Sequence, residues 1–242
     1  LETQLKELRS HYEKVLILVE GTYSMDGDIP DLPRFIALKK RYGCLMMVDE
    51  AHSFGTVGPT GMGSAEHCGV EPGDVDIWMG TLSKSLAAMG GWIGGSKALI
   101  EYLRYTTPGF VFAAGLPPSL GQAALSALRL ILAEPERVTQ LQRNSLFFYE
   151  TLRDLGLDTG PAKGLSPVVP VITGDSLQAL QLSQALLAAG VNSKPIVYPA
   201  VADDAARLRF FVTSLHTEEE LRYTAERVAG LLAEIRGGQP GV

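Results

Sequence analysis

Three short apolar runs, each leading into a polar cluster, constrain the fold of this 242-residue chain more than any other feature. The runs are Val15–Val19, Cys44–Val48 and Val75–Met79, and their apolar, partly β-branched composition is typical of buried strands. Between the first two runs, Asp31 can cap a helix that ends at Gly43. A strand, a helix and a strand in this order form a βαβ unit, so the sequence predicts an α/β fold with a mostly parallel sheet.

The second half of the chain changes character and predicts a further α/β unit. Its expected elements are helices at 119–133 and 136–155, a strand at 168–172, a helix at 176–189, a strand at 207–212 and a last helix after 217. That last helix opens with a capping box, because Glu220 follows Thr217 by three residues. We therefore expect the later part of a large domain in residues 1–130 and a smaller C-terminal domain in residues 131–242.

The charge balance and the cysteine count exclude several classes of protein. The net charge is −6 and the isoelectric point is near 5.3, whereas nucleic acids and membrane surfaces attract basic proteins. No apolar run approaches the roughly 20 residues of a membrane helix. The two cysteines, Cys44 and Cys68, are too few for a disulfide framework. We expect buried free thiols, a cytoplasmic location and no metal site.

Polar residues follow each apolar run, and two of them suggest a specific chemistry. The clusters are Tyr23-Ser24, Asp49-Glu50-Ala51-His52 and Thr81-Leu82-Ser83-Lys84. In a parallel sheet the carboxyl ends of the strands meet at the edge where ligands bind. A carboxylate such as Asp49 can pair with a protonated pyridine nitrogen, and a lysine such as Lys84 can form an imine with a cofactor aldehyde. Taken singly, Asp49 is explained as a loop cap and Lys84 as a solvated lysine at a helix start.

Together these residues belong to a longer pattern. The segment Thr81–Gly90, with the sequence TLSKSLAAMG, resembles position by position the lysine signature of the α-oxoamine synthase family of pyridoxal 5′-phosphate (PLP) enzymes. Glu20–Asp28 resembles the family's strand-end motif, and Val48–His52 stands where the family has Asp-x-x-His. Further matches to the family's C-terminal domain are Pro199-Ala200-Val201, Ala206–Arg209 and Leu215-His216-Thr217. The resemblance implies the PLP-dependent aminotransferase-like fold, fold type I.

The resemblance also implies roles for individual residues. Lys84 would hold PLP as a Schiff base and move the proton at the substrate Cα, and Asp49 would bind the pyridine nitrogen. His52 and Ser24 would lie near the phenolic oxygen of the ring. Thr81 would contact the phosphate of the cofactor. Ser83 would be a further cofactor contact.

Arg209 resembles the family arginine that grips the substrate carboxylate, a task that suits a guanidinium group because it forms paired hydrogen bonds. We prefer it to Arg207, which we expect on the opposite face of the same strand. His216 precedes a helix cap, and a structural role is expected for it.

The family reaction condenses an amino acid with an acyl thioester, releases carbon dioxide and gives an α-aminoketone. The sequences of the motifs are similar to those of serine palmitoyltransferase-like members and of polyketide-associated synthase domains. Alternatives are another fold type I PLP enzyme, such as an aminotransferase or a decarboxylase, and a non-catalytic partner subunit. Asp49-Glu50-Ala51-His52 also spells the DEAH box of helicases, but that class needs a phosphate loop of the form G-x-x-x-x-G-K-[ST], which the sequence lacks.

The sequence departs from the family pattern in two respects. Ala113 and Ala114 stand where the family often has serine or threonine that touches the phosphate of a neighbouring subunit. The family's N-terminal portion, which carries the residue stacked on the PLP ring, has no counterpart here. Because the chain opens at Leu1 in helical rhythm, we expect it to be part of a longer protein that works as a homodimer.

Overall fold

The computed structural model describes residues 1–238, which form two compact units. The large unit comprises Leu1–Thr22 and Ile29–Val138, and the small unit comprises Tyr23–Asp28 and the chain from Thr139 onward. The segment Tyr23–Asp28 therefore belongs to the small unit, although the strand before it and the helix after it lie in the large unit.

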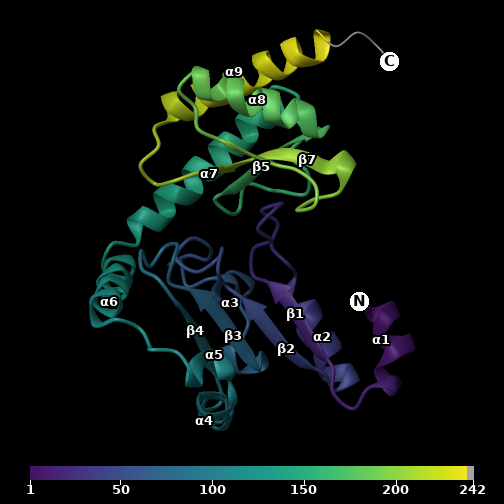
Figure 1. Cartoon of the computed structure of the whole chain (residues 1–242), viewed down its shortest axis with the longest axis vertical. Helices are drawn as coiled ribbons and strands as arrows, with labels where there is room; N and C mark the ends of the chain where they lie inside the picture. Colours follow the sequence, from purple (N-terminus) through teal and green to yellow (C-terminus); the bar gives the residue numbers. More distant parts are fainter. Residues whose placement is uncertain (239–242) are drawn as a thin grey trace. The chain divides into compact units, whose positions relative to one another are not determined.

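The large unit is built on a four-stranded sheet (Figure 1). Its strands are, in spatial order, β1 (Leu16–Glu20), β2 (Leu45–Asp49), β3 (Ile77–Thr81) and β4 (Gly91–Gly95). The first three strands are parallel, which confirms the sequence prediction, and β4 runs antiparallel to β3.

Helices cover one face of this sheet. The α-helices of the large unit are α1 (Glu2–Leu8), α2 (Leu32–Tyr42), α3 (Ser64–Cys68), α4 (Lys97–Thr106), α5 (Pro108–Val111) and α6 (Pro118–Ala133), with 3₁₀ turns at Arg9–His11 and Pro72–Asp74. The buried residues Ile17, Val19, Met46 and Val48 point from β1 and β2 toward a core shared with α1 and α2. Burial of such side chains stabilises the unit by about 1.5–3 kcal/mol each.

The expected helix between β1 and β2 forms for the reason that its sequence suggested. The Asp31 side chain accepts a hydrogen bond from the backbone N–H of Arg34, and Pro33 lies in the first turn. Gly43 ends the helix in the left-handed conformation, which costs glycine little because it has no Cβ. The helix returns the chain to the sheet so that β2 lies beside β1.

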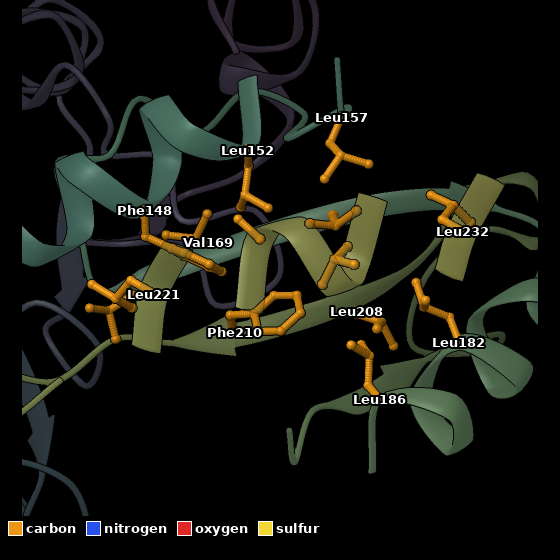
Figure 2. Close-up of a cluster of buried hydrophobic side chains, with 14 of the residues drawn as sticks. Phe148, Leu152, Leu157, Val169, Leu182, Leu186, Leu208, Phe210, Leu221 and Leu232 are labelled. Atoms are coloured by element: carbon orange, nitrogen blue, oxygen red, sulfur yellow. The ribbon is translucent and has the colours of Figure 1, made fainter. Parts of the chain in front are cut away.

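The small unit is a three-stranded antiparallel sheet with helices on one side. Its elements are α7 (Glu136–Asp154), β5 (Val168–Gly174), α8 (Ser176–Ala188), β6 (Lys194–Ile196), a 3₁₀ turn at Asp203–Ala205, β7 (Ala206–Phe211) and α9 (Glu218–Gly237), and β7 lies between β5 and β6. Figure 2 shows Phe148, Leu182, Leu208, Phe210 and Leu232 in the core between sheet and helices. The capping box of Thr217 and Glu220 is present at the start of α9. β6 was not anticipated.

Across residues 1–238, no helix has the length and apolar character needed to cross a membrane. The same residues contain no cluster of three or more histidine, cysteine, aspartate or glutamate side chains suited to a metal ion. Both cysteines are free thiols; Cys44 is buried and Cys68 is half-buried.

Candidate active site

Asp49 ends β2 at the carboxyl edge of the large-unit sheet, as the sequence predicted. It pairs with Glu20 at the end of β1 on one side and with Met79 of β3 on the other, so it stands in the interior of the sheet. Its Oδ1 accepts a 2.8 Å hydrogen bond from the backbone N–H of Ala51. The carboxylate is half-buried and is fixed by its own turn. It can therefore serve as an acceptor for a ligand at this edge.

The turn that carries His52 is anchored by Glu50, whose side chain is only 2% exposed. The Glu50 carboxylate accepts hydrogen bonds from the Ser53 hydroxyl, from the Ser64 hydroxyl at 2.5 Å, and from the Ser64 N–H at 3.0 and 3.1 Å. A side chain at Gly21 would come within 2.9 Å of the same carboxylate, so only glycine fits at the end of β1. His52 itself is half-buried. Sequence reasoning missed Glu50 because its hydrogen-bond partners come from a later segment.

Lys84 lies in a turn directly after β3 and not at the start of a helix. The flanking side chains of Leu82 and Leu86 are buried and hold the turn to the body of the large unit. The backbone N–H of Ala87 donates to the carbonyl of Lys84 at 2.9 Å, and Ala87 has a φ of +50°, which is uncommon for a residue with a side chain. The Lys84 side chain is exposed at the surface of the large unit.

The lysine turn and the His52 turn contact each other. Ser85 Oγ donates a 2.7 Å hydrogen bond to the carbonyl of Phe54, and a Cβ at Gly55 would overlap the Ser85 side chain. Since β2 and β3 are also paired up to Asp49, the structure brings Asp49, His52 and Lys84 to neighbouring turns at one edge of one sheet. This is the predicted convergence for two of the three clusters, whereas Tyr23 and Ser24 belong to the small unit.

Two hydroxyl groups lie just before Lys84. The Oγ atoms of Thr81 and Ser83 are 2.7 Å apart, and the backbone N–H of Ser83 donates to Thr81 Oγ1 at 3.1 Å. Both hydroxyls are at least partly accessible. One of the two hydroxyls donates to the other, so the accepting hydroxyl keeps its O–H to donate to an anion such as a phosphate.

In the small unit, Arg209 lies at the middle of β7. Its Nη1 donates a 2.8 Å hydrogen bond to the carbonyl of Ser24, and its guanidinium stacks over the Phe211 ring with 4.7 Å to the ring centroid. Burial lowers the pKa of this guanidinium from its ordinary value. Its Nε is buried without a hydrogen-bond partner in the described structure. The bond to the Ser24 carbonyl uses one of the five N–H donors of the guanidinium.

The expectation that Arg207 points away from Arg209 is wrong. Side chains two residues apart on a strand share a face, because the side-chain period of a strand is two residues. Arg207 is 7% exposed, and its Nη1 forms an ion pair with Asp26 and donates to the carbonyl of Met25 at 3.3 Å. Both arginines thus reach the Tyr23–Asp28 segment. Within residues 1–238, they differ in that Arg207 forms an ion pair with a carboxylate and Arg209 does not.

A cavity of about 540 Å³ lies in the small unit beside β6 and the start of α9. Arg209, Phe211 and His216 contribute to its wall. His216 has the structural role expected for it, since its Nδ1 accepts a 3.1 Å hydrogen bond from the backbone N–H of Thr213 and its carbonyl accepts one from Asn144.

The residues proposed from the sequence fall into two groups, one in each unit. Those of the large unit are Asp49, His52, Thr81, Ser83 and Lys84, and those of the small unit are Ser24 and Arg209. Within each group the members lie on adjacent segments.

Comparisons with known proteins identify relatives across the chain. The family model described as aminotransferase class I and II matches residues 1–228. The 8-amino-7-oxononanoate synthase of Symbiobacterium thermophilum is 43% identical over 217 residues, and that of Treponema denticola is 41% identical over 221 residues. These matches cover 90% and 91% of the chain.

Solved structures agree with the sequence comparisons. The serine palmitoyltransferase of S. paucimobilis, solved with a bound PLP–myriocin aldimine, superposes with a TM-score of 0.90 at 29% identity. It covers 98% of this chain, and the chain covers 60% of that structure. The chain likewise spans 55% of each of the two synthases named above.

Proposed function

This chain belongs to the aminotransferase class I and II family, and from that membership we propose that it forms the lysine-bearing part of a PLP-dependent α-oxoamine synthase. Such an enzyme joins an amino acid to the acyl group of a thioester, with loss of carbon dioxide and of the thiol. The product is an α-aminoketone. The fold type I architecture of the family agrees with the mostly parallel sheet of the large unit.

The residues present fit this cofactor by their chemistry. Asp49 offers a half-buried carboxylate for a protonated ring nitrogen, and Lys84 offers an amine for an aldehyde. The hydroxyls of Thr81 and Ser83 are 2.7 Å apart, and the one that accepts their mutual hydrogen bond offers its O–H to a phosphate. The cofactor, when bound, would withdraw electrons from the Cα of the amino acid and so make its bonds easier to break.

The protein's own side chains would supply proton handling and orientation. Lys84 Nζ would accept the proton from the substrate Cα and return a proton later in the reaction. His52 and Ser24 would contact the phenolic oxygen of the cofactor ring and hold it in one orientation. Arg209 would bind the carboxylate of the amino acid with charge-assisted hydrogen bonds. This role agrees with the five N–H donors of a guanidinium, of which the bond to the Ser24 carbonyl uses one.

One observation carries the proposal: Asp49 ends β2, the Lys84 turn follows the adjacent parallel strand β3, and the hydrogen bond from Ser85 to Phe54 joins that turn to the turn after Asp49. If Lys84 were only a solvated lysine and Asp49 only a loop cap, nothing would require the two residues to lie at the same edge of the sheet. The names of the relatives support the reaction class, since 8-amino-7-oxononanoate is itself an α-aminoketone. The identities of 43% to such a synthase and 29% to a serine palmitoyltransferase favour the former as a guide to substrates.

The test uses amino acids labelled at the carboxyl carbon and a set of acyl thioesters. An α-oxoamine synthase releases labelled carbon dioxide and free thiol in equal amounts, and only when both substrates are present. Release of labelled carbon dioxide without release of free thiol would instead identify a decarboxylase. Formation of a 2-oxo acid without either product would identify an aminotransferase, and the condensation proposal would then be wrong.

We also infer that the working protein is a cytoplasmic homodimer. Exposed aromatic side chains on α4, on α5 and just after α5 support the dimer, since Tyr105 and Phe112 are 79% and 87% exposed and Tyr102 and Phe110 are exposed as well. We infer that they form one apolar patch, a feature that is rare on monomers and typical of interfaces. Phe112→Glu should shift the mass measured by light scattering from dimer toward monomer, and an unchanged dimer would exclude this patch from the interface.

A further inference from the structure

The segment Tyr23–Asp28 is a closed turn that is tied to the small unit. The N–H of Gly27 donates to the carbonyl of Tyr23 at 2.8 Å, and the N–H of Tyr23 donates to the carbonyl of Asp28 at 2.9 Å. Ser166 Oγ donates a 2.8 Å hydrogen bond to the carbonyl of Gly27. Gly27 has a φ of +72°, and a Cβ there would overlap the carbonyl oxygen of Val168. The turn therefore packs directly against the start of β5.

A buried ion pair adds a second attachment. The side chain of Arg207 is 8% exposed and that of Asp26 is 34% exposed, and Arg207 also donates to the carbonyls of Met25 and Ala205. A charged guanidinium at this depth needs its acceptors, because leaving it unpaired is strongly unfavourable. Asp26 is the only carboxylate paired with Arg207 among residues 1–238. The position of the turn is thereby coupled to the position of β7.

The same face of β7 carries Arg209. The helix-covered core of the small unit contains the side chains of Val169, Val171, Leu208 and Phe210. Because side chains alternate along a strand, Arg207 and Arg209 point to the other face of the sheet. There Arg209 donates to the carbonyl of Ser24, two residues before Asp26. The carbonyl that orients Arg209 is thus part of the turn that Arg207 and Asp26 hold.

We propose that Asp26 and Arg207 are a positioning pair that holds the Tyr23–Asp28 turn on β7 and thereby orients the Arg209 guanidinium for the amino-acid carboxylate. The proposal rests on the proposed role of Arg209 in substrate binding. Neither member of the pair touches the substrate. They act through the Ser24 carbonyl, which fixes one edge of the Arg209 guanidinium.

The experiment compares Asp26→Asn with Asp76→Asn in the PLP-bound protein. Asp76 pairs with Lys39 at similar burial, with exposed fractions of 13% for Lys39 and 31% for Asp76, but it lies in the large unit at the opposite end of β3 from Thr81. We expect Asp26→Asn to speed hydrogen exchange in the peptide spanning residues 23–28 and to raise the dissociation constant for the amino acid about tenfold. The acyl-thioester KM should stay within about twofold, and Asp76→Asn should change none of the three.

A double variant separates positioning from simple stabilisation. Arg207→Gln added to Asp26→Asn removes both charges, so the protein should regain much of its stability because no unpaired buried charge remains. Amino-acid binding should stay weak, since the turn still lacks its attachment. Recovery of both stability and amino-acid affinity would overturn the proposal.

The two readouts also distinguish this proposal from the proposed function. Unchanged exchange at residues 23–28 in Asp26→Asn would show that the pair does not hold the turn. Faster exchange with unaltered amino-acid affinity would show that the turn does not orient Arg209. If the unsubstituted protein gave no change in cofactor absorption with any amino acid, the proposed function would fail, and the exchange comparison would still decide whether the pair holds the turn.

Discussion

The Nη1 atom of Arg209 donates a 2.8 Å hydrogen bond to the carbonyl oxygen of Ser24, a residue 185 positions earlier in the chain. The contact joins the proposed ligand for the substrate carboxylate to a proposed cofactor contact within one compact unit. One edge of the guanidinium is fixed by this bond and by the Phe211 ring beneath it. Because a guanidinium has five N–H donors, it can keep this anchor and still bind a carboxylate.

Arg209→Lys should weaken amino-acid binding much more than acyl-thioester binding. Lysine keeps the charge but cannot make the anchoring hydrogen bond and a paired contact in the same planar geometry. Loss of a charge-assisted contact of about 1–3 kcal/mol corresponds to about 5- to 150-fold weaker binding. Titrating the amino acid against the cofactor absorption band measures the change.

Lys194→Gln is the matched control for that prediction, because Lys194 pairs with Arg209 in the register of β6 and β7 and is an exposed cation. It should leave amino-acid affinity within about twofold, as expected for a surface charge. If Lys194→Gln lost amino-acid affinity and Arg209→Lys bound the amino acid normally, Arg209 would not be the ligand of the substrate carboxylate.

Asp49→Asn should leave PLP bound but slow turnover about 10- to 100-fold or more, since a neutral amide makes a weaker hydrogen bond to a protonated ring nitrogen. The substitution is conservative for the fold, because an asparagine Oδ1 can still accept the hydrogen bond from the Ala51 N–H. Cofactor content by absorbance and steady-state condensation rate measure the two effects separately. Near-normal rates in a PLP-saturated variant would exclude Asp49 as the ring-nitrogen partner.

The parts of the fold that depend on local chemistry could be predicted from the sequence. The helix from Leu32 to Tyr42 follows from its Asp31 cap and Gly43 end, and α9 follows from the capping box at Thr217. The position of the large-unit candidate site could also be predicted from the sequence. Asp49 ends one apolar strand, Lys84 comes shortly after another, and parallel strands share a carboxyl edge. These signals lie within a few residues of the elements that they specify.

The parts that depend on distant contacts could not be predicted. Nothing near Tyr23–Asp28 indicates that its partners are Ser166 and Arg207, more than 135 residues later. The antiparallel direction of β4 and the three-residue strand β6 depend on pairing with β3 and β7 rather than on their own composition. The error over Arg207 was different in kind, since a period of two already places it on the face of Arg209.

Glu50→Gln should destabilise the large unit by about 1–3 kcal/mol, because the Gln NH₂ would face donors that now point at a carboxylate oxygen. The affected donors are the Ser53 and Ser64 hydroxyls and the Ser64 N–H. Glu66→Gln is the comparison, as Glu66 accepts similar bonds from Thr60 and Met62 but is less buried. Urea unfolding should give a clearly lower midpoint for Glu50→Gln than for Glu66→Gln. Equal midpoints would mean that the deeper burial of Glu50 does not increase the stability lost on substitution.

Asp28→Asn should remove a pH dependence from the stability of the protein. Burial raises the pKa of the Asp28 carboxyl above its ordinary 3.8, and the charge of nearby Asp26 raises it further, although a backbone hydrogen bond opposes both. The folded state therefore favours the protonated form, so the associated stability is present below pH 3.8 and is lost as the pH rises through the higher folded pKa. The difference in unfolding free energy between wild type and Asp28→Asn should fall over this range and become constant above the folded pKa. A difference that rose with pH would reverse the assigned direction.

Borohydride treatment of the PLP-bound protein, followed by peptide mapping, should place the pyridoxyl group on Lys84. The Lys84 turn is held by buried Leu82 and Leu86 on either side, so the side chain extends from a fixed backbone toward the surface of the large unit. Lys84→Ala should abolish the label and reduce condensation by about 10²- to 10⁴-fold, the range of positioned proton transfer. Lys97→Ala, at the first position of α4 and equally exposed, should retain both label and rate. A pyridoxyl group on Lys97 or Lys194 would show that the lysine after β3 is not the one that binds the aldehyde, and the position of Lys84 and Asp49 at one edge of β2 and β3 would then need another explanation.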